Sequence, residues 1–176
     1  PDDLTIPGLD SDKTSSGQRI GIYAQDEWHL NQNWSTTLGL RADREQNRAL
    51  AWSPRAALIW HASPDTTLKA LYGQAHRSPN AYERDYFDGV ALIANPSLDG
   101  ERITTLELVA EQRLGHDLNL RGALYRWKME DIITLVDVGG GLSQYQSGSE
   151  IRANGLELAA DRNWNDGSRL RGSLSW

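Results

Sequence analysis

The densest group of side chains able to contact a small solute lies in one segment, residues 77–102. Aromatic rings offer flat apolar faces for stacking, and guanidinium groups offer charge-assisted hydrogen bonds. We therefore predict that this segment contacts a ligand through Tyr82, Arg84, Tyr86 and Phe87. The alternative is that these residues form a gate or pack against neighbouring loops.

The histidines do not form a metal-ligand pattern. His29, His61, His76 and His116 occur singly, none with a ligand partner two or four positions away, and the chain has no Cys. We expect no metal bound directly by this chain and no cofactor. A catalytic nucleophile would need a base and an orienting group around it, and no such motif surrounds any Ser or His, so no enzyme is expected.

Composition narrows the class of protein. The net charge of −6 disfavours nucleic acid as a partner, because backbone phosphates require a basic surface. The longest apolar runs, such as residues 56–60, fall far short of the roughly 20 residues that a membrane-spanning helix needs. The chain has 16 Gly, 7 Trp and 6 Tyr against one Phe and one Met, which favours β-hairpins with interfacial aromatics over a globular core.

The elements that would position the ligand segment are strands with one apolar and one polar side. Over residues 34–43, Trp34, Thr36, Leu38, Leu40 and Ala42 alternate with Ser, Thr, Gly, Arg and Asp. Residues two apart share a face of a strand. A face of Arg, Asp and Thr cannot fill a dry core, so the pattern favours a barrel with lipid outside and a polar lumen.

Eight such strands are expected, joined by alternately short and long connections. The short turns are at 31–33, 63–65, 115–117 and 165–167, and the long connections are at 47–53, 77–102 and 131–150. The polar stretch before residue 18 is expected to be loop. The predicted strands are 18–30, 34–46, 54–62, 66–76, 103–114, 118–130, 151–164 and 168–176.

The fold class is therefore all-β, an antiparallel up-and-down transmembrane β-barrel segment of about eight strands. Leucine-rich positions, such as Leu40, Leu108 and Leu158, are expected to face lipid. The polar partners are expected to face the lumen, where they hold a further domain, line a solute path, or simply pair with one another across strands. The lumen-facing set is Arg41, Lys69, Arg77, Glu107, Arg121 and Glu157.

Periodicity alone leaves other architectures open. A soluble lipocalin-like binding protein would place the leucines inside and the charges outside. Trp28, Trp34, Trp60 and Trp164 lie near the short turns, where a membrane-interface girdle would stand, and this favours the membrane barrel. If the short turns face the periplasm, both chain ends lie outside, so we expect part of a larger barrel rather than a complete eight-stranded one.

Several motifs, taken in order, resemble those of TonB-dependent outer-membrane receptors. Residues 23–28 and 38–43 resemble one barrel hairpin of that family, and residues 53–58 with 71–80 and Glu83 resemble the next. The Asn-Pro-Ser-Leu segment at 95–98, followed by Glu101 and residues 106–108, matches a further family motif, as do 124–125, 131–133 and 152–158.

The resemblance implies a segment of a receptor in the bacterial outer membrane. Such receptors are large barrels, closed by an N-terminal plug, that take up a scarce nutrient, most commonly a ferric siderophore. Implied partners are membrane lipid, the remaining barrel strands, the plug, TonB acting through the plug region, and an extracellular small ligand. Residues 1–176 are expected to form a single barrel segment that contains neither plug nor TonB box.

Overall fold

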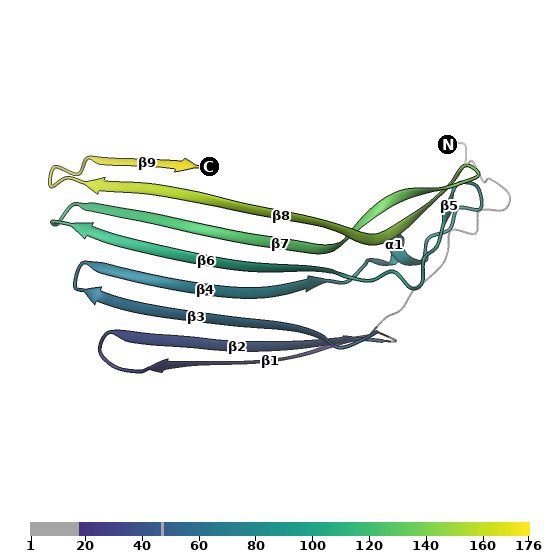
Figure 1. The fold of residues 1–176 in the computed structure, drawn as a ribbon, viewed down its shortest axis with the longest axis horizontal. Helices are drawn as coiled ribbons and strands as arrows, with labels where there is room; N and C mark the ends of the chain where they lie inside the picture. The colour runs from purple at the N-terminus through teal and green to yellow at the C-terminus, as the bar shows by residue number, and fades with distance from the viewer. Residues whose placement is uncertain (1–17, 47) are drawn as a thin grey trace, which may run out of the picture.

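The computed structural model describes residues 18–46 and 48–176, which form one long antiparallel sheet (Figure 1). The stretch before residue 18, predicted to be loop, lies outside the described residues. The principal strands are β1 (Arg19–His29), β2 (Trp34–Glu45), β3 (Ala51–Ser63), β4 (Thr66–Arg77), β6 (Glu101–Leu114), β7 (Leu118–Gly139), β8 (Leu142–Asn163) and β9 (Arg169–Ser175).

Each of these strands pairs antiparallel with its neighbour in the chain, in the order β1-β2-β3-β4-β6-β7-β8, with β9 on the far side of β8. The predicted up-and-down order is therefore confirmed. Among the described strands β1 pairs only with β2, and β9 only with β8. The sheet is unclosed, so these strands do not make the complete eight-stranded barrel weighed above.

The prediction of a loop over residues 131–150 is wrong. Strand β7 continues to Gly139 and β8 begins at Leu142, so the two strands form one long hairpin. Residues 132–138 are rich in Ile, Thr and Val, whose branched side chains favour strands. A bulge interrupts the ladder between Met129 and Ile133, and Asp131 there has φ 57°. Toward its turn the β7–β8 hairpin bends away from β6, to the upper right of the view (Figure 1).

The long connection between β4 and β6 carries two short elements. Helix α1 (Ala81–Asp85) begins at Asn80, which forms a capping box with Glu83: each side chain accepts a hydrogen bond from the other residue's backbone N–H. Strand β5 (Leu92–Ile93) pairs in parallel with Ser143 and Gln144 of β8. No other pair of described strands is parallel.

The strand register separates apolar from polar side chains. One row across five strands is Leu58, Ala70, Leu108, Leu124 and Leu156, each opposite the next, and we call this side of the sheet the leucine face. The six positions predicted to line a lumen all lie on the opposite side, the polar face. The alternation therefore predicted which residues share a side of the sheet.

Burial differs between the two faces. Leucine-face side chains such as Leu108 (52% exposed) and Leu124 (56% exposed) are open. Outside β5, the buried strand residues are on the polar face: Ser35, Asp43, Ser53, Val109 and Ala123.

Helix α1 is five residues long. No helix in the described part of the chain is both long and apolar enough to cross a membrane.

Candidate functional site

The segment predicted to contact a ligand is held against the part of the β7–β8 hairpin that lies near its turn. The backbone N–H of Ser143 donates to the carbonyl of Ala91 (2.6 Å), beside the β5–β8 pairing. The side-chain amide of Asn95 donates to the carbonyl of Tyr145 (2.9 Å). The Gln144 amide donates to the carbonyl of Ala94 (3.0 Å). Residues 78–100 and the hairpin therefore form one assembly.

Three tyrosines meet in this assembly. Tyr82 stacks on Tyr86, with 4.6 Å between ring centroids and 23° between ring planes. Tyr145 of β8 meets Tyr82 edge-on at 6.1 Å and 68°. Offset and edge-to-face pairs of this kind are favoured by the ring quadrupoles. Tyr82 is 54% exposed and nearby Phe87 60% exposed, so the cluster keeps ring surface available to a solute.

Arg84, in the same helix as Tyr82, is already engaged. Its Nε and Nη2 atoms donate to the two carboxylate oxygens of Asp85, at 2.7 and 2.5 Å. This pairing raises the pKa of the Arg84 guanidinium above its ordinary value. A ligand would meet an Arg–Asp pair rather than an isolated cation.

The carboxylate of Asp88 shapes the turn that leads into β5. It accepts hydrogen bonds from the backbone N–H groups of Val90, Ala91 and Leu92, at 2.9, 2.8 and 2.8 Å. These three donors stabilise the charged form and hold the pKa of Asp88 below its usual range. Asp88 therefore has a structural part in the loop.

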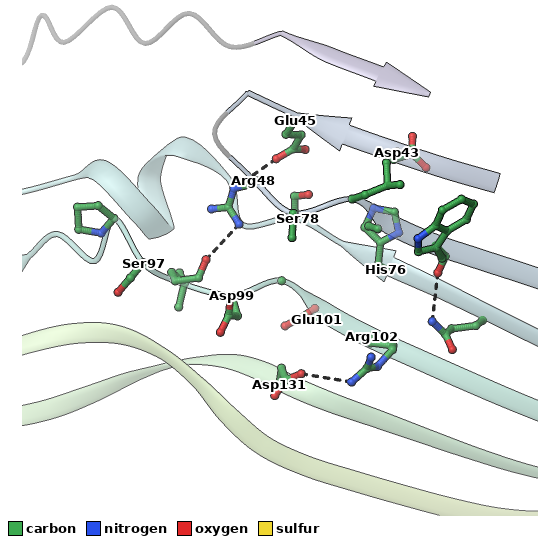
Figure 2. Close-up of a pocket in the computed structure, with 18 residues that line it drawn as sticks. Asp43, Glu45, Arg48, His76, Ser78, Ser97, Asp99, Glu101, Arg102 and Asp131 are labelled. Atoms are coloured by element: carbon green, nitrogen blue, oxygen red, sulfur yellow. Dashed lines mark hydrogen bonds and ion pairs between the residues drawn. The ribbon is translucent and has the colours of Figure 1, made fainter. Parts of the chain in front are cut away.

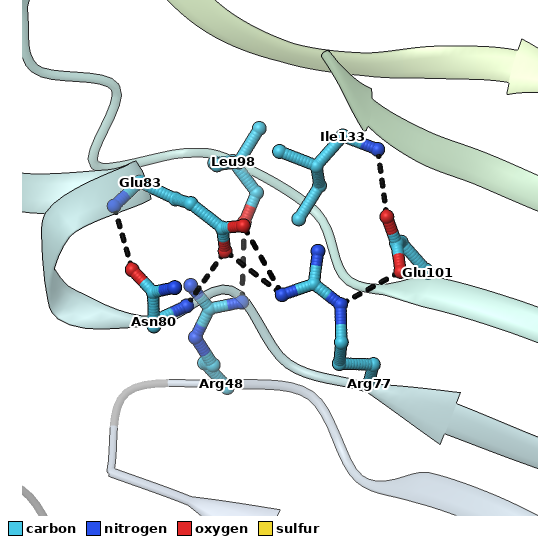
Figure 3. Close-up of polar contacts among 7 residues, drawn as sticks. All are labelled: Arg48, Arg77, Asn80, Glu83, Leu98, Glu101 and Ile133. Atoms are coloured by element: carbon cyan, nitrogen blue, oxygen red, sulfur yellow. Dashed lines mark hydrogen bonds and ion pairs between the residues drawn. The ribbon is translucent and has the colours of Figure 1, made fainter.

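An ion-pair network ties the base of the loop to the strands (Figure 3). The guanidinium of Arg77, at the end of β4, donates to Glu101 (2.7 Å) and to Glu83 of α1 (3.0 Å). The other oxygen of Glu101 accepts from the backbone N–H of Ile133 (3.0 Å). Arg77 and Glu101 thus link β4, α1, β6 and the bend of the β7–β8 hairpin.

A cavity of about 490 Å³ opens between the β2–β3 connection and residues 96–102 (Figure 2). Arg48 reaches across from the connection: its Nη1 donates to the carbonyl of the buried Leu98 (3.1 Å), and its Nε lies 3.5 Å from Glu45. On the strand side, Ser53 and His76 lie within hydrogen-bond distance (3.1 Å).

The charged side chains that line the cavity are mostly paired. Asp43 is paired with Arg41 (2.6 Å), and Arg102 lies 3.8 Å from Asp131. Within residues 18–46 and 48–176, no three His, Cys, Asp or Glu side chains come together in a way that could hold a metal ion. The cavity can offer hydrogen bonds and charge to a polar solute or to a covering polypeptide segment.

Several of the polar-face positions pair with one another. Lys69 contacts Glu111 at 2.8 Å, and Arg121 contacts Glu107 at 3.1 Å, each across neighbouring strands. The carboxylate of Glu157 has neither an ion pair nor a hydrogen bond among the described residues. Pairing across strands, the simpler of the roles considered above, therefore accounts for Lys69, Glu107 and Arg121.

The structure adds residues that the sequence reasoning missed. Tyr145 joins the tyrosine cluster, although its segment was predicted to be loop. The capping box of Asn80 and Glu83 had a readable signal, since Asn-x-x-Glu before a short helix is a known start pattern. The contact of Glu101 with Ile133 had none, because it depends on how β7 bends.

The comparisons identify the family. Residues 1–176 match the model of the family described as TonB dependent receptor-like, β-barrel. The chain therefore belongs to this family, whose members are outer-membrane receptors and transporters rather than enzymes. The open sheet is part of such a barrel, which excludes the lipocalin-like alternative.

One curated relative is the iron-regulated outer membrane virulence protein of Vibrio cholerae, which is 26% identical over 140 residues. The match covers 77% of this chain and 22% of the relative. The chain therefore spans less than a quarter of that protein's length.

Solved structures share the fold. The siderophore receptor PirA from Pseudomonas aeruginosa superposes with a TM-score of 0.76 at 22% identity, over 92% of this chain and 32% of that one. A ferric enterobactin receptor mutant of P. aeruginosa (PfeA), in complex with enterobactin, gives 0.81 at 23%, over 98% and 29%. The copper transporter OprC gives 0.69 at 20%, over 91% and 28%.

Proposed function

We propose that this chain is a wall segment of an outer-membrane receptor that takes up a scarce nutrient, and that the nutrient is a ferric siderophore. The observation that carries the proposal is the cluster of Tyr82, Tyr86 and Tyr145, held between the 78–100 connection and the β7–β8 hairpin at one end of the sheet. The cluster presents exposed ring surface suited to an organic chelator. Two of the relatives named above are siderophore receptors, and a third is iron-regulated.

The proposal orients the sheet with its short turns in the periplasm and its long connections outside, as is usual for bacterial barrels. The stacked pair of Trp34 and Trp60, with centroids 5.2 Å apart, lies on the leucine face next to short turns. An indole there can be apolar on one side and wet on the other. This placement supports a membrane boundary at the short-turn end.

The polar face is proposed to line the lumen. Side chains on the inner side of a curved wall converge, which fits the burial of Ser35, Val109 and Ala123 on that face. Arg41, Lys69, Arg77, Glu107, Arg121 and Glu157 would then meet the plug or the solute path. Among them, Glu157 faces the small Ala123 across the strands, and its carboxylate has no partner among the described residues. We therefore propose Glu157 as the position best able to contact the plug.

In the intact receptor, the plug and the remaining strands would complete the barrel, TonB would act through the plug region, and lipid would cover the leucine face. Arg84, because it is paired with Asp85, is proposed to orient the loop as well as to contact the ligand.

The test compares variants of the intact receptor. Replacing Tyr82, Tyr86 and Phe87 together with Ala should weaken ferric siderophore binding at least tenfold, since each ring lost from a ligand contact removes of the order of 1 kcal/mol. Tyr82→Phe, which keeps the ring, should bind as the parent does. Replacing Arg84 as well should not impair barrel assembly, measured as heat-modifiable migration of the folded barrel on gels.

Val90→Ala provides a matched control, because Val90 is an exposed apolar residue of the same loop (77% exposed) that lies outside the tyrosine cluster. If the parent and the triple variant bind the ferric siderophore with equal affinity and both assemble normally, the proposed contact site is refuted. This segment would then be only part of the barrel wall.

A further inference from the structure

One row of the strand register on the polar face carries a cation and an indole with only small residues between them. Arg55 of β3 lies opposite Gly73 of β4, which lies opposite Thr105 of β6. Thr105 in turn lies opposite Trp127 of β7. Arg55 and Trp127 are therefore three strand spacings apart, or roughly 14 Å. We call these four residues the Arg55–Trp127 row.

The polar face is open between the two ends of this row. A Cβ atom on Gly73 would meet no atom within 4 Å. Thr105 has a short side chain, and Ala153, which lies opposite Trp127 on β8, has a shorter one. The row therefore leaves room for a ring beside the indole of Trp127.

Arg55 differs from most charged residues of the polar face in having no partner. Lys69 is paired with Glu111, and Arg121 is paired with Glu107. Arg55 is exposed, and its guanidinium makes no ion pair or hydrogen bond with the residues that the structure describes. Its N–H groups are therefore available to an anion, with which they would form charge-assisted hydrogen bonds.

Trp127 lies among apolar and aromatic side chains on the same face. Ile103, Met129 and Ile151 lie opposite one another, one step nearer the long connections. Tyr125 lies one step in the other direction along β7. Indole and phenol rings stack on other aromatic groups, so this part of the polar face favours a ligand that carries rings.

The leucine face shows at which level of the membrane the row lies. Arg126, next to Trp127 in the chain, is on the leucine face, opposite Leu106 and Asn154. The leucine face therefore ceases to be apolar at this level, which places the edge of the hydrocarbon layer there. With the long connections outside, the row lies where a solute that leaves the 78–100 loop enters the barrel.

We infer that Arg55 and Trp127 form a second contact site for the ligand, and that this site selects an anionic chelate with aromatic rings, of the catecholate class. The guanidinium of Arg55 binds the negative charge of the chelate, and a catechol ring stacks on Trp127. The inference rests on the proposed uptake function and adds to it the chemical class of the ligand. An uncharged hydroxamate chelate without rings would gain from neither side chain.

The experiment uses the full-length receptor in detergent and measures equilibrium binding of ferric enterobactin, an anionic chelate of catechol rings. Arg55→Gln and Trp127→Leu should each weaken binding roughly fivefold. Arg55→Lys and Trp127→Phe, which keep the charge and the ring, should retain most of the affinity. Binding to Arg55→Gln should also depend less on salt than binding to the parent, because one screened charge has been removed.

Gly73→Leu tests the site without removing either contact. The leucine side chain should fill the space between Arg55 and Trp127 and so lower the affinity for ferric enterobactin. Arg126→Gln is the matched control, because Arg126 is also an exposed strand Arg without an ion pair among the described residues, but lies on the leucine face. Its replacement should leave ferric enterobactin binding unchanged.

Unchanged affinity for ferric enterobactin in both Arg55→Gln and Trp127→Leu would overturn the inference. If these two variants lost thermal stability but not affinity, the row would contact the plug rather than the ligand. A loss of affinity in Arg126→Gln equal to that in Arg55→Gln would show an effect of net charge alone, and would also overturn the inference.

Ferrichrome, an uncharged hydroxamate chelate, is measured in parallel. Tighter binding of ferrichrome than of ferric enterobactin would overturn the catecholate class while leaving the proposed uptake of a ferric siderophore intact. If the parent bound neither chelate, both the proposed uptake function and this inference would be refuted.

Discussion

The ring of Tyr125 lies across Gly155 on the polar face. The two residues are opposite one another in the β7–β8 ladder, and a Cβ atom at position 155 would meet the Cζ and Oη atoms of the tyrosine. The glycine therefore provides the space in which the aromatic ring covers the backbone.

Replacing Gly155 with Ala should destabilise the barrel, because the added methyl group forces Tyr125 out of its place. Overpacking of this kind costs about 1–3 kcal/mol. Urea unfolding of the intact receptor in detergent measures the change. Gly73→Ala is the control on the same face, since a Cβ at Gly73 meets nothing within 4 Å. Similar losses for both variants would contradict the steric explanation, and Tyr125→Ala should relieve the effect of Gly155→Ala.

Replacing Leu108 with Arg should impair insertion by about 2–4 kcal/mol if the residue lies near the middle of the membrane, because the guanidinium would enter hydrocarbon. Thr105→Arg on the polar face should cost little. Folding into phospholipid vesicles, followed by urea titration, compares the two variants. Equal costs would refute the assignment of the leucine face to lipid.

Replacing Gly100 with Ala should loosen the base of the 78–100 loop. A Cβ there would lie 2.7 Å from the carbonyl oxygen of Arg77, and a backbone atom cannot swing aside as a side chain can. Hydrogen exchange of residues 78–100 should quicken in this variant, and ligand affinity should fall with it. Asp99→Ala, an exposed neighbour, should leave exchange unchanged. Normal protection in Gly100→Ala would show that the loop tolerates the shift.

The turn held by the Asp88 carboxylate should unfold only at acidic pH. The pKa of Asp88 is lowered in the folded loop from its ordinary value of 3.8, so the charged form contributes stability above that value and loses it as pH falls through the lowered pKa. Peptic cleavage at residues 86–92 should therefore begin only below about pH 4. At neutral pH, a neutral protease should cleave Asp88→Asn more readily than the parent at the same residues. The cleavage of Asp88→Asn should depend little on pH. Cleavage of the parent already at pH 6 would contradict this.

The faces of the sheet were predictable from sequence because a period of two is a local property. Leu38 and Leu40 alternate with Gly39 and Arg41 regardless of the rest of the chain, so the register could only confirm which residues share a side. The short turns were marked by Asn, Pro, Gly and Asp.

The packing of residues 78–100 on the β7–β8 hairpin was not predictable in the same way. Gly139, Gly140 and Gly141 lie in the segment predicted to be a long connection, yet they have φ between 66° and 92° and close a tight hairpin. The pairing of β5 with β8 and the meeting of Tyr82 with Tyr145 join positions far apart in the chain. The engagement of Arg84 by its neighbour Asp85 depends on rotamers that composition does not reveal. The ligand-contact role of Tyr82, Arg84, Tyr86 and Phe87 stays a prediction.

The parallel pairing of Leu92 with Ser143 imposes an order on folding. The β7–β8 hairpin is built from contacts close in sequence, whereas β5 can find its partner only after that hairpin exists. We expect newly inserted receptor to acquire its strands first and its ligand affinity later, with a lag set by closure of residues 78–100 onto the hairpin. A receptor could thus be fully inserted in the membrane and still, for a time, be unable to capture its cargo.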